Sequence, residues 1–569
     1  MRILLLVTSF NSLSQRVFVE LRERGHDLSV EFDVNDSVVE EAVRLWRPDI
    51  VIAPYLRRAI PAAVHRDTPC LVVHPGPPGD RGPSALDWAI LDGRERWGLT
   101  VIEATEVLDG GPVRAHRDFP MRPAAKSSLY RDETTEAALA ALLEALDAIV
   151  ATRSWRAPPG DGAPGAWRPR VSPADRRIDW SADLTATILQ KIWSADGQPG
   201  TQDEILGLPC TLHDAWPEGE LTGQAGKIIA RRHGAICRAT IDGAVWIGHL
   251  KPLTAAAHER PFKLPATLAL AHVLDDEVPA SPPPLASRER RATYREIAYD
   301  EANGVGWLSF EFYNGAMSVD QCRRLIEAYR YALTRPTRVI VLAGGREFWS
   351  NGMNLNVIEA ASSQADESWA NINAIDDLAH AILTTASKIT LAAVEGNAGA
   401  GGVFLALGAD RVVARQGVLF NAHYKNMGNL YGSEYWTYVL PRRIGPELAQ
   451  AVMKTRLPMG MAEARRLGLV DQVLPHDRSQ FRARVRRLAE DIAGDPRFDL
   501  LVAEKKARLA QDEARRPLKS YRDAELERMR LNFYGFDPSY HVARWRFVTK
   551  EPHARTPLHL ARHRQASRE

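Results

Sequence analysis

The first part of the chain constrains the fold most, because short apolar runs alternate there with helical patterns. Apolar runs at residues 4–7, 28–32 and 50–53 are separated by helix-like stretches at 14–24 and 38–46. This β-α-β-α-β order predicts a parallel sheet covered by helices on both faces. Ligands of such sheets bind outside the carboxyl ends of the strands. Functional residues are therefore expected where the predicted strands end.

The remaining sequence predicts further domains, since 569 residues exceed what one core usually supports. Stretches rich in Pro at 158–169 and 279–287 are typical of linkers. Between them, a helical pattern precedes short alternating runs, which predicts a small β domain with one helix. A new series of strands and helices follows and ends in a charged helical tail. The predicted domains are residues 1–160, 161–278 and 295–569, with a linker at 279–294.

Composition argues against several functions. The formal net charge is only +2, so no strong field attracts nucleic acid or an anionic membrane. No stretch is long and apolar enough to cross a bilayer, and the apolar run after Met1 is too short for a signal peptide. The four scattered cysteines show neither metal-ligand spacing nor a disulfide framework. We therefore expect a cytoplasmic protein without a bound metal.

The segment from His74 to Ser84 follows an apolar strand at residues 71–73. A histidine at a strand end lies where these sheets place their ligands. A second strand, predicted at 97–101, leads to the turn Leu108-Asp109-Gly110-Gly111. This turn can present Asp109 to the same crevice as His74. A buried hydrogen-bonded pair without catalytic function is the alternative for these two residues.

These motifs resemble the catalytic domain of the methionyl-tRNA formyltransferase family over about residues 1–275. The likeness implies a Rossmann-like domain followed by a small β-rich, OB-like domain. It also implies that His74 and Asp109 help move a formyl group from 10-formyltetrahydrofolate, with Arg81 and Gly82 in the cofactor-binding segment. The family's catalytic asparagine is replaced by Val72. Gln15 is our candidate for the missing donor, and a surface or helix-capping role is its alternative.

Two glycine-rich segments, residues 343–355 and 394–406, mark a second site in the back half of the chain. Glycines there let backbone N–H groups approach a ligand closely. An apolar run follows the second segment, and the N-terminus of a helix formed by it would favour negative charge. The two segments together predict a ligand-binding site.

The pair resembles the enoyl-CoA hydratase/isomerase (crotonase) superfamily over about residues 295–530, which implies a ββα-spiral fold and coenzyme A as a ligand. By this resemblance Asn351 and Gly401 would each supply one N–H to an oxyanion hole for a thioester carbonyl. The implied coenzyme A-binding residues are Ala316, Gly352 and Gly402.

The chain departs from this superfamily where hydratases carry two water-activating glutamates. Those positions hold Phe404 and, with less certain alignment, Tyr424, so no paired carboxylates are available to add water. Glu434 lies in a loop that faces the pocket in the superfamily. Tyr424 and Glu434 are therefore candidate catalytic residues. A core tyrosine and a structural ion pair are the respective alternatives.

Joined in one chain, the two halves resemble the HypX/HoxX maturation factors of [NiFe] hydrogenase. That resemblance implies an α/β enzyme that forms formyl-CoA from 10-formyltetrahydrofolate and coenzyme A, then releases carbon monoxide. It implies the hydrogenase large subunit or its maturation machinery as partners. Two alternatives stay open: an amine formyltransferase fused to an acyl-CoA isomerase or hydratase, and a non-catalytic scaffold that binds folate and coenzyme A.

Overall fold

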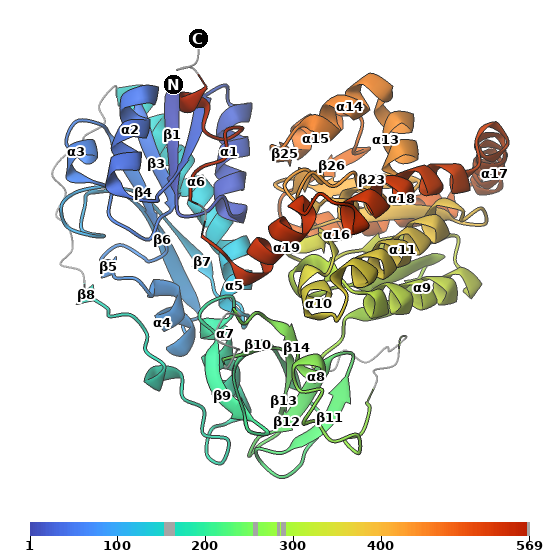
Figure 1. The fold of residues 1–569 in the computed structure, drawn as a ribbon, viewed down its shortest axis with the longest axis horizontal. Helices are drawn as coiled ribbons and strands as arrows, with labels where there is room; N and C mark the ends of the chain where they lie inside the picture. Colours follow the sequence, from blue (N-terminus) through green and yellow to red (C-terminus); the bar gives the residue numbers. More distant parts are fainter. Residues whose placement is uncertain (153–165, 254–259, 282–284, 286–291, 553, 566–569) are drawn as a thin grey trace. The chain divides into compact units, whose positions relative to one another are not determined.

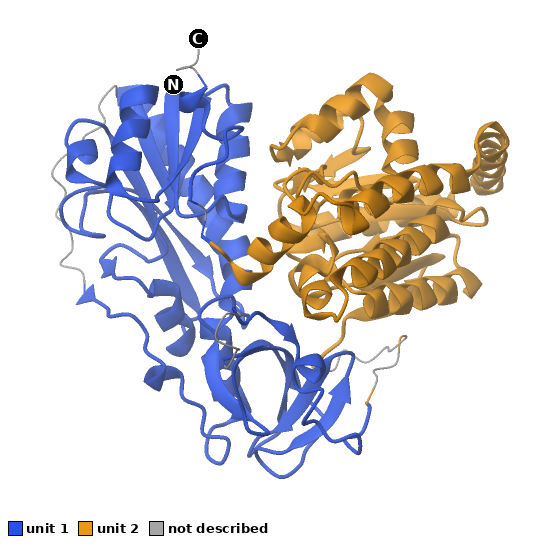
Figure 2. Cartoon of the chain, in the orientation of Figure 1, with its two compact units in different colours: residues 1–280, 552–569 blue, residues 281–551 orange. Residues whose placement is uncertain are grey.

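The structure, a computed structural model, describes residues 1–152, 166–253, 260–281, 285, 292–552 and 554–565. It divides into two compact units, residues 1–280 with 552–569, and residues 281–551 (Figures 1 and 2). Both units mix helices and strands, as the sequence predicts. None of the described helices is long and apolar enough to span a membrane. Most of the two predicted linkers lies outside the described residues.

A six-stranded sheet in the order β2-β1-β3-β4-β6-β7 forms the first half of unit 1. Its first four strands along the chain run parallel, as predicted, whereas β6 is antiparallel to both β4 and β7. The sheet as a whole is therefore mixed. The strands are β1 (Arg2–Val7), β2 (Asp27–Phe32), β3 (Ile50–Tyr55), β4 (Cys70–His74), β6 (Arg96–Glu103) and β7 (Val113–Pro120).

Helices α1 (Ser12–Glu23), α2 (Asp36–Trp46) and α6 (Thr135–Thr152) pack on this sheet (Figure 1). Alternate strand residues such as Leu4 and Leu6 pack against Trp46 on α2, which is the period-two burial that a covered strand requires. Because β1, β3 and β4 are parallel, the loop before α1 and the segment after His74 lie at the same edge of the sheet.

The small predicted β domain completes the fold of unit 1 up to residue 280. Its antiparallel sheet has the order β11-β12-β13-β10-β9, and β14 pairs with β13. The predicted helix is α7 (Thr185–Ala195), which packs against β10, and a second, short helix, α8 (Ala266–Ala269), packs against β13. The strands are β9 (Thr201–Ile205), β10 (Leu208–Glu218), β11 (Ile228–Arg232), β12 (Ala235–Ala239), β13 (Ala244–Pro252) and β14 (Leu264–Pro265).

The end of the chain returns to unit 1 and covers the edge strand β2. The Val30 N–H donates to the Leu560 carbonyl oxygen at 3.0 Å. The fully buried carboxylate of Glu31 contacts His563 at 2.9 Å and Arg564 at 2.8 Å. Residues 552–565 thus protect an otherwise open sheet edge. The sequence alone placed them with residues 295–551.

Unit 2 winds repeatedly from a main sheet into a smaller sheet and then into a helix. The main sheet has the order β15-β16-β18-β21-β23-β26, and the smaller one β19-β22-β24-β25. This repetition is the ββα spiral implied by the sequence resemblance. The strands that begin each repeat are β18 (Val339–Ala343), β21 (Ile389–Val394) and β23 (Arg411–Arg415), followed by β19 (Phe348–Ser350), β22 (Asn397–Gly399) and β24 (Leu419–Asn421).

The remaining strands close the two sheets and add a short pair. β15 (Ile297–Ala302), β16 (Val305–Phe310) and β26 (Gln472–Leu474) complete the main sheet, and β25 (Met459–Gly460) ends the smaller one. The parallel pair β17 (Ala316–Met317) and β20 (Gly352–Met353) lies beside the glycine segments. The predicted helical tail is two helices, α17 (Phe498–Arg515) and α18 (Leu518–Tyr534), which are separated at Pro517.

The helices that position the second site are α9, α11, α12, α13 and α18. α11 packs against α9 and α18, and α12 packs against α13. The short helix α12 consists entirely of buried residues. Their bounds are α9 (Val319–Thr334), α11 (Gln364–Leu383), α12 (Gly401–Leu407) and α13 (Trp436–Ile444).

Candidate active sites

His74 ends strand β4 in unit 1 and is buried. Its Nε2 lies 2.9 Å from Oδ2 of Asp80, and its Nδ1 lies 3.6 Å from Oδ1 of Asp109. The imidazole is thus held between two carboxylates, one within hydrogen-bond distance and one just beyond it. Asp80 was not singled out from the sequence, although it belongs to the quoted motif. Two carboxylates around one histidine can orient the ring and stabilise its protonated form.

Glycine at position 76 makes the contact between His74 and Asp80 possible. A Cβ at Gly76 would lie 2.4 Å from Asp80 Oδ2 and 2.7 Å from His74 Nε2. The Thr100 hydroxyl donates to the Gly76 carbonyl oxygen at 2.6 Å, and Thr100 is the cross-strand partner of His74. The turn is therefore fixed to the sheet, and the sheet holds the histidine.

Asp109 lies in the predicted turn and has left-handed backbone geometry, with φ of +54°. The Gly82 N–H donates to Asp109 Oδ2 at 3.2 Å. A Cβ at Gly110 would lie 2.7 Å from a guanidinium nitrogen of Arg81, so the Arg81 side chain reaches the same turn. The structure therefore brings together four of the predicted front residues, His74, Asp109, Arg81 and Gly82.

Gln15 lies on α1, at the same sheet edge as His74 but on the far side of the intervening strand β3. Its side-chain amide donates to the Phe10 carbonyl oxygen at 2.9 Å. Val72, at the position of the missing asparagine, is half-buried on β4. The role of Gln15 as a replacement donor stays a prediction.

In unit 2 the two glycine segments converge. A Cβ at Gly352 (φ +78°) would lie 3.6 Å from the backbone nitrogen of Gly401, and Ala316 pairs with Gly352 across β17 and β20. A Cβ at Gly402 would clash with the Ser350 carbonyl oxygen at 2.0 Å. Gly402 therefore permits a close backbone approach that a side chain would block, and the positive φ at Gly352 favours glycine there.

The two predicted oxyanion donors differ. Gly401 opens α12, so its N–H has no acceptor one turn earlier in the helix. The Asn351 N–H donates to the Gly315 carbonyl oxygen at 2.7 Å, and the Asn351 side chain donates to the Asn314 carbonyl oxygen at 2.8 Å. To hold a ligand oxygen, the Asn351 N–H would have to exchange or share this acceptor.

Tyr424 and Glu434 form a buried pair beside Gly401. The Tyr424 hydroxyl donates to Glu434 Oε2 at 2.5 Å and also contacts the Ser433 carbonyl oxygen at 3.1 Å. A Cβ at Gly401 would lie 2.0 Å from Glu434 Oε1, so the carboxyl group abuts the start of α12. The Phe404 ring stacks on the Tyr424 ring, with centroids 5.5 Å apart. The two rings thus form an aromatic wall beside the pair.

Burial keeps protons on this pair. Desolvation, together with the negative charge of Asp376, raises the pKa of Glu434 to about 8. Desolvation and the Glu434 charge raise the pKa of Tyr424 well above its usual range. The pair therefore carries exchangeable protons in a place that excludes water, which is suited to general acid–base chemistry.

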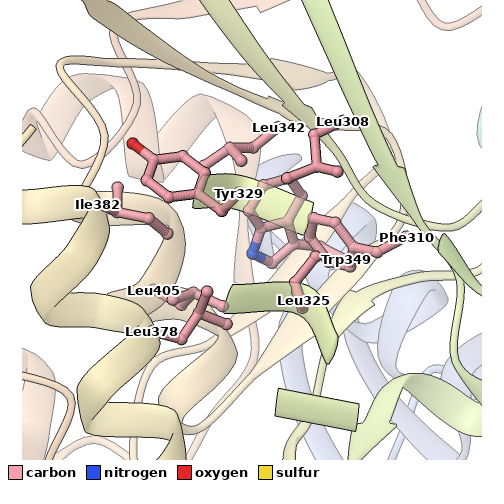
Figure 3. A pocket seen from close by; sticks show the side chains of 9 residues that line it. All are labelled: Leu308, Phe310, Leu325, Tyr329, Leu342, Trp349, Leu378, Ile382 and Leu405. Carbon is pink, nitrogen blue, oxygen red and sulfur yellow. The ribbon is translucent and has the colours of Figure 1, made fainter. Parts of the chain in front are cut away.

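The structure also contains an apolar cavity within unit 2, between the main sheet, α9 and α11 (Figure 3). Its walls are hydrophobic and aromatic side chains, and no predicted site residue is among them. The cavity is therefore separate from the Tyr424–Glu434 pair. The lining residues are Leu308, Phe310, Leu325, Tyr329, Leu342, Trp349, Leu378, Ile382 and Leu405.

Comparisons with known proteins agree with the fold of both halves of the chain. Residues 1–146 match the formyl transferase family, residues 170–258 its C-terminal domain, and residues 312–533 the enoyl-CoA hydratase/isomerase family. A methionyl-tRNA formyltransferase of Roseiflexus castenholzii is 31% identical over 38% of this chain and 72% of its own. The fold and sites thus define a formyltransferase joined to a crotonase-type domain.

Two relatives share the whole arrangement. The hydrogenase maturation factor HoxX of Bradyrhizobium diazoefficiens is 54% identical over 99% of this chain and 97% of its own. The crystal structure of HypX from Aquifex aeolicus in complex with tetrahydrofolic acid superposes with a TM-score of 0.95, at 48% identity over 99% of both chains. The chain belongs to the HypX/HoxX family of hydrogenase maturation factors.

Proposed function

We propose that this protein makes carbon monoxide in two steps, with formyl-CoA as the shared intermediate. Residues 1–160 and 161–278 would transfer the formyl group of 10-formyltetrahydrofolate to coenzyme A. Residues 295–569 would split formyl-CoA into carbon monoxide and coenzyme A. The carbon monoxide would serve as a ligand of the [NiFe] hydrogenase active site, so the hydrogenase large subunit or its maturation machinery is the proposed partner.

The first step forms a C–S bond and breaks the bond between the formyl carbon and N10 of the folate. The coenzyme A thiol, with an ordinary pKa of about 8.5, is partly ionised at neutral pH and is a strong nucleophile. His74 would take the thiol proton and return it to the departing N10. Asp80 and Asp109, at 2.9 and 3.6 Å, would hold the ring and stabilise its charged state. Arg81 and Gly82 would bind the folate.

The second step breaks the C–S bond of formyl-CoA and moves the formyl proton to the sulfur, so it needs no oxidant or co-reactant. The Gly401 N–H, with that of Asn351 if it leaves Gly315, would hold the carbonyl oxygen. Ala316, Gly352 and Gly402 would line the backbone cradle of the coenzyme A arm. Tyr424 and Glu434 would carry the proton from carbon to sulfur.

The observation that carries the proposal is the composition of the back pocket. Its two glycine segments converge at Gly352 and Gly401, but Phe404 and Tyr424 stand where hydratases keep their water-activating glutamates. Glu434 reaches Gly401 from another loop and is buried, with 1% of its surface exposed. A pocket that activates a thioester without placing water favours loss of carbon monoxide over hydrolysis.

The test is a gas-phase assay of purified protein incubated with 10-formyltetrahydrofolate and coenzyme A. We expect carbon monoxide and tetrahydrofolate in equal amounts. An amine formyltransferase fused to an isomerase would release no carbon monoxide and would need an amine acceptor. A scaffold would leave the formyl donor unconsumed. Either of those results would contradict the proposal.

A further inference from the structure

Behind the Tyr424–Glu434 pair, two more carboxylates are buried in unit 2. Asp376 on α11 and Glu525 on α18 each have none of their surface exposed. Neither residue matches a catalytic position of the sequence motifs. Buried carboxylates are costly unless their oxygens are satisfied, so their partners show what they do.

Almost all of those partners belong to one turn, residues 433–437. Asp376 Oδ1 accepts from the Glu434 N–H and Oδ2 accepts from the Ser433 hydroxyl, both at 2.8 Å. Glu525 Oε2 accepts from the Tyr435 N–H at 3.0 Å, and Oε1 accepts from the Thr437 N–H at 2.8 Å. Two helices thus hold the same turn through hydrogen bonds that their carboxyl oxygens accept.

The turn at residues 433–437 has strained backbone geometry at Glu434, the candidate catalytic residue. Glu434 and Tyr435 both have left-handed backbone geometry, with φ of +58° and +59°. Such geometry is unfavourable for residues with large side chains and persists only where the surroundings enforce it. The result of the strain is that the Glu434 carboxyl points back to Tyr424 and Gly401.

We propose that Asp376, together with Glu525, is a positioning residue that clamps this turn and so holds the Glu434 carboxyl between Tyr424 and the start of α12. The inference rests on the proposed role of Glu434 in thioester cleavage. It goes beyond the two-step scheme, because that scheme assigns no role to the buried carboxyl groups of Asp376 and Glu525.

The clamp has an electrostatic consequence as well as a geometric one. The negative charge of Asp376 favours the protonated form of Glu434. The other charged or titratable groups that act on Glu434 or its clamp are Glu525, Arg522, Tyr424, Asp377 and Cys322. Arg522 offsets part of the negative charge, with its Nε 3.7 Å from Asp376 Oδ2. Removing the Asp376 charge should therefore let Glu434 lose its proton at lower pH.

Two substitutions of Asp376 separate its effect on the geometry of the turn from the effect of its charge on Glu434. In Asp376→Asn the amide oxygen can still accept from the Glu434 N–H, and the amide NH₂ can donate to the Ser433 hydroxyl. Asp376→Ala removes both contacts. The matched control is Asp366→Asn on the same helix, whose side chain accepts from the Tyr534 hydroxyl at 2.8 Å and does not contact the turn at residues 433–437.

The deciding measurement is difference infrared spectroscopy of the protonated carboxylic acid of Glu434 across pH, with each protein compared with its own Glu434→Gln version. We expect the Glu434 signal of Asp376→Asn to disappear at a pH lower by roughly one unit than in the wild type. Asp366→Asn should titrate like the wild type. An unmoved titration in a folded Asp376→Asn protein would overturn the electrostatic part of the proposal.

Formyl-CoA cleavage then tests the geometric part. We expect Asp376→Asn to retain most of its rate below pH 7 and to lose it at lower pH than the wild type, whereas Asp376→Ala should lose roughly 10²-fold at every pH. If the alanine variant is folded and as active as the asparagine variant, the clamp is not required. The infrared titration needs no turnover, so it stands even if the protein does not release carbon monoxide.

Discussion

The two sites hold a proton-carrying group in different ways. In unit 1, His74 sits at a strand end between two carboxylates supplied by nearby loops, and Gly76 and Thr100 fix its surroundings. In unit 2, Glu434 sits on a strained turn held by two helices that are distant in the sequence. A catalytic side chain at a strand end is held by the sheet itself. A catalytic side chain on a strained turn needs further residues that hold the turn in place.

The difference fits the chemistry proposed for each site. Formyl transfer to a thiol needs a base that takes and returns a proton near neutral pH, which is the ordinary behaviour of histidine. Loss of carbon monoxide needs a dry pocket, and burial makes carboxyl groups retain protons there. Each prediction below disturbs one of the two sites.

The largest effect is expected from His74→Ala. Loss of a general acid–base typically costs roughly 10²–10⁴-fold, and here it should stop consumption of 10-formyltetrahydrofolate. Cleavage of added formyl-CoA should be unchanged, because that reaction belongs to the other unit. Folate turnover at close to the wild-type rate would show that His74 is not the base.

Tyr424→Phe should produce the opposite pattern. The variant loses the hydroxyl that donates to Glu434 at 2.5 Å but keeps the ring that stacks on Phe404. We expect formyl-CoA cleavage to fall roughly 10²-fold while the first half-reaction continues. Single-turnover measurements with each substrate separate the two steps. Equal losses in both steps would mean that the sites are not independent.

Asp80→Asn should have a smaller effect on the first site. The amide can still contact His74, but a neutral acceptor forms a weaker hydrogen bond with the ring than a carboxylate does, so the ring is held less firmly. We expect roughly a 10-fold loss of formyl transfer, with cleavage of added formyl-CoA unchanged. Asp118→Asn, on β7 of the same sheet, is the matched control. Formyl transfer at the wild-type rate would show that the Asp80 carboxylate is not needed to hold His74.

The smallest effect concerns stability. Burial raises the pKa of Glu525, as of Glu434, to about 8, above the 4.3 or so of an unfolded glutamate. The native state therefore binds protons that the unfolded chain has released. This contribution is fully present below the unfolded pKa and is lost as pH rises through 8.

The Tm should accordingly fall as pH rises from 7 to 9, and it should fall less in Glu434→Gln, which cannot lose this proton. Scanning calorimetry at matched ionic strength measures both slopes. A Tm that rises over this interval would contradict the assignment of protonated, buried carboxyl groups to unit 2.

Local patterns in the sequence predict much of the fold. The short apolar runs locate β1 to β4. The two glycine-rich segments, residues 343–355 and 394–406, locate the strands and the turn around Gly352 and Gly401. The sequence also predicts that His74 and Asp109 share one crevice, and the structure brings their side chains to 3.6 Å, although β6, which precedes Asp109, is antiparallel to β4. The direction of β6 was not predicted, since an apolar run alone does not indicate whether a strand runs parallel or antiparallel.

Features that depend on distant segments were missed. Asp80 turns back onto His74 only because Gly76 leaves room for it. Asp376 and Glu525 meet the turn at Glu434 only after α11 and α18 pack together, and no local motif records that packing. The engagement of the Asn351 N–H by Gly315 is likewise visible only in the folded chain. Nor does the sequence show that residues 552–565 cover β2.

The most direct test of the central claim follows an isotopic label through the shared intermediate. Protein is mixed with excess 10-formyltetrahydrofolate labelled with ¹³C in the formyl group and with coenzyme A below the enzyme concentration. The wild type should release many equivalents of labelled carbon monoxide per coenzyme A, because the second step regenerates the thiol. Tyr424→Phe should instead accumulate labelled formyl-CoA, and His74→Ala should form neither product. Labelled carbon monoxide in the absence of coenzyme A, or labelled formate as the sole product of the wild type, would contradict the account.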